Sequence, residues 1–138
     1  MLISKPKVLS IDDNKMLNVM RQKVLGLSGF DCDLAYTAEQ ALAMVITCDY
    51  DAILLDYYLP GTTGLQVAST IKTLRPTPPI IVVTGEDLYE RCEAVHSYVV
   101  KGEGPEVLLA KLKSALNPSS ANPSSAVRRE ALHQPSWV

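Results

Sequence analysis

The chain has few cysteines and no long apolar run. Its three cysteines, Cys32, Cys48 and Cys92, are far apart and include no CxxC pair, which argues against a disulfide framework and against a zinc site. No apolar run approaches the roughly 18 residues of a membrane span, and the N-terminus lacks the apolar stretch of a signal peptide. These absences predict a soluble, cytoplasmic protein without a membrane segment.

An excess of charge of one sign is also missing. The formal net charge is −2, from 13 basic and 15 acidic residues, so the surface as a whole does not favour nucleic acid as a direct partner. Apolar residues make up 47% and charged residues 20% of the 138 residues, as is ordinary for one globular domain with a core.

Short apolar runs at 7–11, 52–55, 80–83 and 97–100 predict buried strands. Residues 30–34 alternate apolar and acidic side chains, which is typical of a half-exposed strand at a sheet edge. Apolar residues at helical spacing predict four helices, marked by Met16, Met20, Val24 and Leu27, by Ala38, Ala41, Leu42 and Val45, by Leu65, Ala68, Ile71 and Leu74, and by Leu108, Leu112, Ala115 and Leu116. Thr37 and Gln40 predict a capping box, and Pro105 suits the first position of the last helix.

Strands that alternate with helices predict an α/β fold. We expect a single (βα)5 unit with a doubly wound parallel sheet in the strand order 2-1-3-4-5, which places ligands at the carboxyl ends of the strands. Residues 1–116 are the predicted domain. Residues 117–138 begin with the repeat NPSSANPSSA and are predicted to be a Ser/Pro-rich linker or disordered tail.

Polar residues follow four of the predicted strands. Asp12 and Asp13 follow the first, Asp56 the third, Thr84 the fourth and Lys101 the fifth, and these strands are neighbours in the expected order. Clustered carboxylates repel one another and call for a hard cation such as Mg²⁺. A lysine and a threonine beside that cation can donate to phosphoryl oxygens. The pattern predicts a phosphoryl-transfer centre with a carboxylate nucleophile.

Four motifs together resemble the response-regulator receiver domain of bacterial two-component signalling. They are IDDN at 11–14, LLDYYLPGTTG at 54–64, VVTG at 82–85 and YVVKG at 98–102. The resemblance implies a histidine-aspartate phosphorelay in which Asp56 accepts the phosphoryl group. It also implies that the chain is not an enzyme beyond its own phosphotransfer and dephosphorylation.

The same resemblance implies roles for the other residues. Asp13, Asp56 and the backbone carbonyl of Tyr58 would bind Mg²⁺ directly, and Asp12 would support it through water. Thr84 and Lys101 would hold the phosphoryl oxygens, and the aromatic residue Tyr98 would change rotamer as Thr84 moves. The partners would be a sensor histidine kinase or phosphotransfer protein and a downstream protein. Separately, the acidic segment EDLYERCE at 86–93 would be a poor surface for self-association, which predicts a monomer.

The sequence departs from the receiver pattern in two places. Gly102 follows Lys101 where the family usually has a cis-proline, so we expect a trans peptide there, with the glycine forming the tight turn. The interval GEDLYERCEAVHS before Tyr98 is also short, which predicts a fourth helix shortened by about one turn.

Other interpretations remain at this stage. Taken singly, Asp12 and Asp13 could cap a helix, Thr84 could begin a turn, Lys101 could be a surface lysine and Tyr98 a core aromatic residue. A haloacid-dehalogenase-like phosphohydrolase would need a second acid where this chain has Tyr58, and a flavodoxin-like nucleotide binder would need a glycine-rich first turn where this chain has IDDNK. A receiver that switches without phosphorylation is the last alternative. Residues after 116 leave no room for an output domain, which favours a single-domain regulator or an excised receiver.

Overall fold

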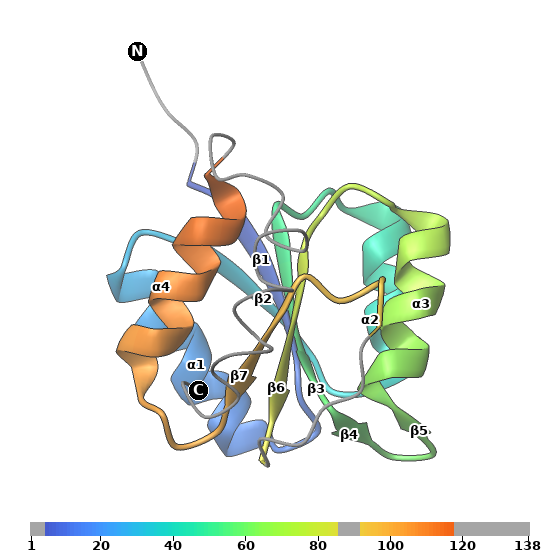
Figure 1. Cartoon of the computed structure of the whole chain (residues 1–138), viewed down its shortest axis with the longest axis horizontal. Coiled ribbons are helices and arrows are strands. Elements are labelled where there is room, and N and C mark those ends of the chain that lie inside the picture. Colours follow the sequence, from blue (N-terminus) through green and yellow to red (C-terminus); the bar gives the residue numbers. More distant parts are fainter. Residues whose placement is uncertain (1–4, 86–91, 118–138) are drawn as a thin grey trace, which may run out of the picture.

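Five parallel strands form the centre of the molecule. The computed structural model describes residues 5–85 and 92–117, and within them the sheet has the order β2-β1-β3-β6-β7 (Figure 1). These strands are β1 (Lys7–Ile11), β2 (Asp31–Ala35), β3 (Ala52–Asp56), β6 (Ile80–Thr84) and β7 (Ser97–Val100). The predicted strand order and the edge position of the strand near residue 31 are confirmed.

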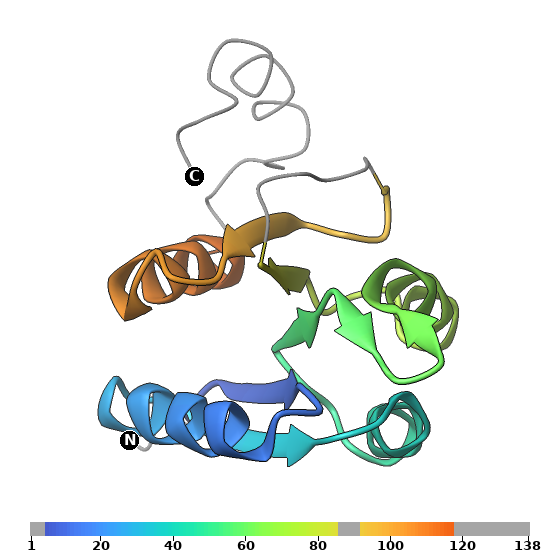
Figure 2. The ribbon, with the colours of Figure 1, turned by 90° about the horizontal axis from the view of Figure 1, so that it is seen from below.

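Helices cover both faces of this sheet. α1 (Lys15–Leu27) and α4 (Pro105–Leu116) lie on one face, and α2 (Ala38–Thr47) and α3 (Gly64–Leu74) lie on the other (Figures 1 and 2). Successive strand residues point to opposite faces, so Leu54 packs with Leu112 of α4 whereas Leu55 packs with Ile71 of α3. This arrangement is the doubly wound α/β fold that the sequence predicts.

The first helix forms where the apolar spacing predicts it, but its apolar stripe is not its buried face. Met16, Met20 and Leu27 are 73%, 55% and 91% exposed, whereas Asn18 and Leu25 are fully buried. A polar side chain therefore takes a position facing the sheet. The apolar periodicity therefore predicted the position of the helix correctly but not which of its faces is buried against the sheet.

A small hairpin that the sequence analysis did not anticipate follows β3. β4 (Tyr58–Leu59) pairs antiparallel with β5 (Thr62–Thr63), and Gly61, with φ of +79°, lies in the turn between them. Thr63 and Gln66 then form a full capping box at the start of α3. The hairpin and the cap hold the backbone in place just after Asp56.

The capping box predicted for α2 forms only in part. The Thr37 hydroxyl accepts from the Gln40 amide at 3.0 Å, but the Gln40 side chain accepts from the amide of Tyr36 rather than from that of Thr37. Thr37 alone therefore caps this helix.

The segment between β6 and β7 is described at Gly85 and at 92–96, and the latter residues form a turn and no helix. The fourth helix, predicted in shortened form around 86–93, lies mostly on residues 86–91, and nearly all of the predicted tail lies on 118–138; both ranges are outside the described residues. No cis peptide occurs in the described part of the chain, and Gly102 has φ of +97°, as the sequence predicts. Among the helices described, none is long and apolar enough to cross a membrane.

Candidate functional site

Asp56 ends a fully buried strand in the middle of the sheet. It lies in register with Val83 of β6, and the amide of the next residue, Tyr57, donates to the Val83 carbonyl at 2.9 Å. Asp56 is only 5% exposed. A carboxylate so withdrawn from water is costly unless a cation or a reaction compensates it.

Two further carboxylates lie beside Asp56. One oxygen from each of Asp12, Asp13 and Asp56 lies within 4.8 Å of the others. Asp12 is fully buried, and Asp13 is exposed at the rim. An open cluster of hard oxygen ligands fits Mg²⁺, which keeps several waters and needs few carboxylates. The structure thus brings together the three acids that the sequence analysis selected.

Lys101 reaches the same point from the end of β7. Its ammonium nitrogen lies 3.2 Å from Oδ1 of Asp56 and 3.9 Å from Oδ2 of Asp12. Its backbone amide donates to the carbonyl of Thr84 at 2.6 Å, so β6 positions the start of the lysine. The ammonium group stands where a phosphoryl group on Asp56 would need a positive partner.

Thr84 lies on β6, the strand next to that of Asp56, and Tyr98 lies on β7, one strand further away. Thr84 is the last residue of β6, 2% exposed, and in register with Val100. Tyr98 is half-buried on β7 and packs against the core on the side of α2 and α3. A role for these two residues in a switch stays a prediction.

Tyr58 lies on β4, two residues beyond Asp56, and its side chain is 61% exposed. The hairpin keeps its backbone close to the carboxyl end of β3. Metal ligation by its carbonyl oxygen stays a prediction.

The protonation of Asp56 depends on its neighbours. Burial raises the pKa of the Asp56 carboxyl, the nearby Asp12 raises that pKa further, and Lys101 lowers it. The free-energy cost of ionising Asp56 is therefore set by the balance between the acids and the cations of the site. A bound divalent cation would shift this balance toward the carboxylate.

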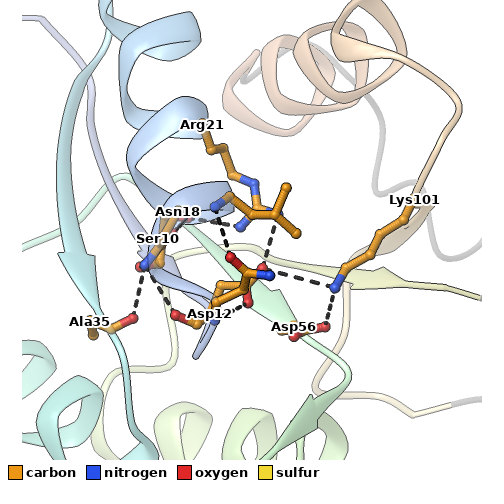
Figure 3. A network of polar contacts seen from close by, with 9 residues as sticks. Ser10, Asp12, Asn18, Arg21, Ala35, Asp56 and Lys101 are labelled. Carbon is orange, nitrogen blue, oxygen red and sulfur yellow. Dashed lines mark hydrogen bonds and ion pairs between the residues drawn. The ribbon is translucent and has the colours of Figure 1, made fainter.

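A buried polar network supports Asp12 from behind, and the sequence analysis missed it (Figure 3). The side-chain amide of Asn18 donates to the carbonyls of Ser10, Asp12 and Ala35 at 3.1–3.3 Å. Arg21 donates to the Ser10 hydroxyl at 3.1 Å and to Oδ2 of Asp12 at 3.2 Å. A signal was present, since Ser10 is polar in an apolar strand and Asn18 and Arg21 are three residues apart on one helix.

Comparison with protein families identifies one match over most of the chain. The model of the response regulator receiver domain matches residues 8–113. The phosphate regulon transcriptional regulatory protein PhoB of Pseudomonas aeruginosa is 31% identical over 126 residues, which are 86% of this chain and 55% of PhoB. The response regulator ArlR of Staphylococcus saprophyticus is 30% identical over 114 residues, or 80% of this chain and 52% of ArlR. The chain spans about half the length of these curated relatives.

Solved structures give the same match. The response regulator TrrA of Thermotoga maritima, in complex with Mg²⁺ and BeF, is 30% identical with a TM-score of 0.75, covering 80% of this chain and 99% of TrrA. A CheY-like receiver domain from Methanospirillum hungatei is 27% identical with a TM-score of 0.74, covering 82% of this chain and 94% of that protein. None of these matches favours a phosphohydrolase of the haloacid-dehalogenase type.

Proposed function

The chain belongs to the response-regulator receiver domain family of two-component signalling, and from this premise we propose that Asp56 is its phosphoacceptor. The observation that carries the proposal is the position of Asp56, buried at the centre of the sheet with Lys101 3.2 Å from one of its oxygens and two other acids within 4.8 Å. Asp13 is exposed, and Asp12 already accepts from Arg21 and from the amide of Asn14. Asp56 is therefore the acid best placed to react.

In the proposed reaction an oxygen of Asp56 attacks the phosphorus atom of a phosphohistidine. The new O–P bond forms as the N–P bond breaks, and the departing imidazole takes up a proton from water. Lys101 holds a phosphoryl oxygen through its ammonium group, and Thr84 offers its hydroxyl to another. The acyl phosphate leaves Asp56 with added negative charge beside Lys101.

Mg²⁺ is the cofactor in this proposal, held by Asp13, Asp56 and the Tyr58 carbonyl, with Asp12 acting through water. The cation would offset the negative charge that three carboxylates and a phosphoryl group bring together. The acid cluster supports this assignment, because its oxygens are close, hard and open to solvent on the side of Asp13.

The proposed output is a change of surface near β6 and β7. Movement of Thr84 toward the phosphoryl group would open space that the half-buried ring of Tyr98 can fill. A downstream protein would recognise that surface, and the chain itself would remain a monomer in the cytoplasm. The phosphodonor, a sensor histidine kinase or a phosphotransfer protein, would approach the rim where α1 begins, beside the exposed Met16 and Met20.

Intact-mass spectrometry after incubation with acetyl phosphate and Mg²⁺ tests the proposal. We expect a gain of about 80 Da, the mass of one phosphoryl group, that is lost with a chelator and lost in Asp56→Asn. Asp31→Asn changes an exposed acid on β2 and should retain the adduct. An adduct that persists in Asp56→Asn would contradict the assignment.

A further inference from the structure

Arg21 places a buried cation behind the acid cluster. Its side chain is 10% exposed, and its guanidinium lies 3.2 Å from Oδ2 of a fully buried Asp12. The other end of the guanidinium donates to Ser10, whose hydroxyl donates in turn to Asn18 at 2.6 Å. Packing and hydrogen bonds therefore fix the position of this positive charge.

Arg21 changes the charge that the site presents to a metal. The cluster holds three carboxylates, and two cations lie within ion-pair distance of it, Lys101 at 3.2 Å from Asp56 and Arg21 at 3.2 Å from Asp12. Figure 3 shows Arg21 and Lys101 approaching the acids from different sides. Lys101 has the phosphoryl group as its partner in the proposed reaction, whereas Arg21 contacts Asp12 and Ser10.

The two oxygens of Asp12 are both occupied by the protein. Oδ1 accepts from the amide of Asn14 at 2.9 Å, and Oδ2 accepts from Arg21. A carboxylate neutralised and held in this way attracts a cation less strongly than an unpaired one. The neutralised Asp12 also repels the Asp56 carboxylate less, so the electrostatic free energy of the metal-free site is lower.

We propose that Arg21 is a built-in counter-cation that sets the Mg²⁺ affinity of the site by neutralising Asp12. The inference rests on the Mg²⁺ site of the proposed function. Loss of the positive charge at position 21 should make Mg²⁺ bind more tightly, because the metal then compensates an unpaired buried carboxylate and meets one fewer positive charge. Near a buried site one unit charge acts strongly on a divalent ion, so we expect a dissociation constant about tenfold lower.

Isothermal titration calorimetry of the unphosphorylated chain with MgCl₂, at fixed pH and ionic strength, measures the Mg²⁺ dissociation constant. Arg21→Gln keeps an amide donor and removes the charge, and Arg21→Met removes both. Arg21→Lys keeps the charge and loses the two-pronged contact. Lys23→Gln is the matched control, since Lys23 is exposed on the same helix and its replacement removes the same charge.

We expect Arg21→Gln and Arg21→Met to bind Mg²⁺ about tenfold more tightly, and Arg21→Lys and Lys23→Gln to stay within about threefold of the unaltered chain. If Arg21→Met does not fold, the Mg²⁺ affinity of Arg21→Gln alone decides between the two outcomes. In an Asp12→Asn background the substitution Arg21→Gln should tighten Mg²⁺ binding clearly less than about tenfold, because only the direct repulsion between Arg21 and the metal is then removed.

The inference is overturned if Arg21→Gln binds Mg²⁺ within about twofold of the unaltered chain or more weakly, or if Lys23→Gln tightens binding equally. Those results leave the proposed function intact as long as the unaltered chain binds Mg²⁺. Absence of Mg²⁺ binding by the unaltered chain would overturn both the metal site and the role of Arg21.

Discussion

A Cβ atom on Gly64 would lie 2.5 Å from the backbone oxygen of Asp56 and 3.0 Å from Cα of Tyr57. The first residue of α3 therefore packs directly against the strand end that carries Asp56. The amide of Gly64 also donates to the carbonyl of Tyr57. The start of α3 and the backbone of the site form one unit that has no room for a side chain.

Gly64→Ala should destabilise the fold by about 2 kcal/mol, because rigid backbone rather than a flexible side chain meets the added methyl group. Urea denaturation without Mg²⁺ measures the change. Gly26→Ala is the control, since Gly26 lies within α1 with nothing within 4 Å of the added atom, and it should stabilise by about 0.5 kcal/mol. Equal effects of the two substitutions would contradict the close approach at Gly64.

Asp56→Asn should raise the thermal midpoint of the metal-free chain. The pKa of Asp56 is raised by burial and by Asp12, so the folded state binds a proton more readily than the unfolded state, and the ionised carboxylate lowers stability at neutral pH. Removing that charge should gain roughly 3 °C, as about 1 kcal/mol does in a chain of this size. Stability of the unaltered chain should correspondingly gain from this group as pH falls through its folded pKa.

Differential scanning calorimetry with a chelator tests this expectation, with Asp31→Asn as the control for loss of an exposed acid. Mg²⁺ should reduce the advantage of Asp56→Asn, because the metal stabilises only the chain that keeps the carboxylate. A lower midpoint for Asp56→Asn than for Asp31→Asn would show that Lys101 more than offsets the cost of burial.

Lys111 should make stability depend on pH in the alkaline range. Burial lowers the pKa of its ammonium group from 10.5 to about 8, although Glu103 acts in the opposite direction. Between these two values the unfolded state binds more protons, so the stability contributed by this group rises as pH increases from about 8 to 10.5. The amine still donates to the Tyr98 carbonyl, 2.5 Å away, after it loses its proton.

Urea denaturation at pH 7 and pH 10 measures this effect as the difference between the unaltered chain and Lys111→Met. The unaltered chain should gain stability relative to Lys111→Met at the higher pH. Lys113→Met removes an exposed lysine from the same helix and should show no such gain. A constant difference between the unaltered chain and Lys111→Met would mean that Lys111 titrates normally.

The sequence predicted the strands and the grouping of the acids because both follow from strong local signals. Buried parallel strands appear in the sequence as short apolar runs. Because the carboxyl ends of parallel strands lie at the same edge of the sheet, Asp12, Asp56 and Lys101 could be placed together from strand order alone. Local patterns also predicted Pro105 at the start of the last helix and Gly102 in a tight turn with a trans peptide, and the structure confirms both.

What the sequence did not reveal depends on tertiary contacts. Asn18 faces the sheet because its amide serves three backbone carbonyls that no helical periodicity reports. Arg21 was not among the residues selected from the sequence, and only the fold places it behind Asp12. The β4–β5 hairpin has strands of two residues each, too short for an alternating pattern to be recognised.

The phosphorylated chain should stay a monomer at tens of micromolar. Residues 86–93, EDLYERCE, carry four acids against one arginine, so a two-fold symmetric dimer that used this segment would bring its acids against the same acids of the other copy. Sedimentation equilibrium with Mg²⁺ and beryllofluoride, a mimic of the phosphoryl group, gives the mass at concentrations where micromolar dimers would form. The same measurement without beryllofluoride is the control. Twice the monomer mass in the presence of the mimic, reversed by Leu88→Ala or Tyr89→Ala, would show that this segment is a dimer surface and that the output is self-association rather than contact with a different protein.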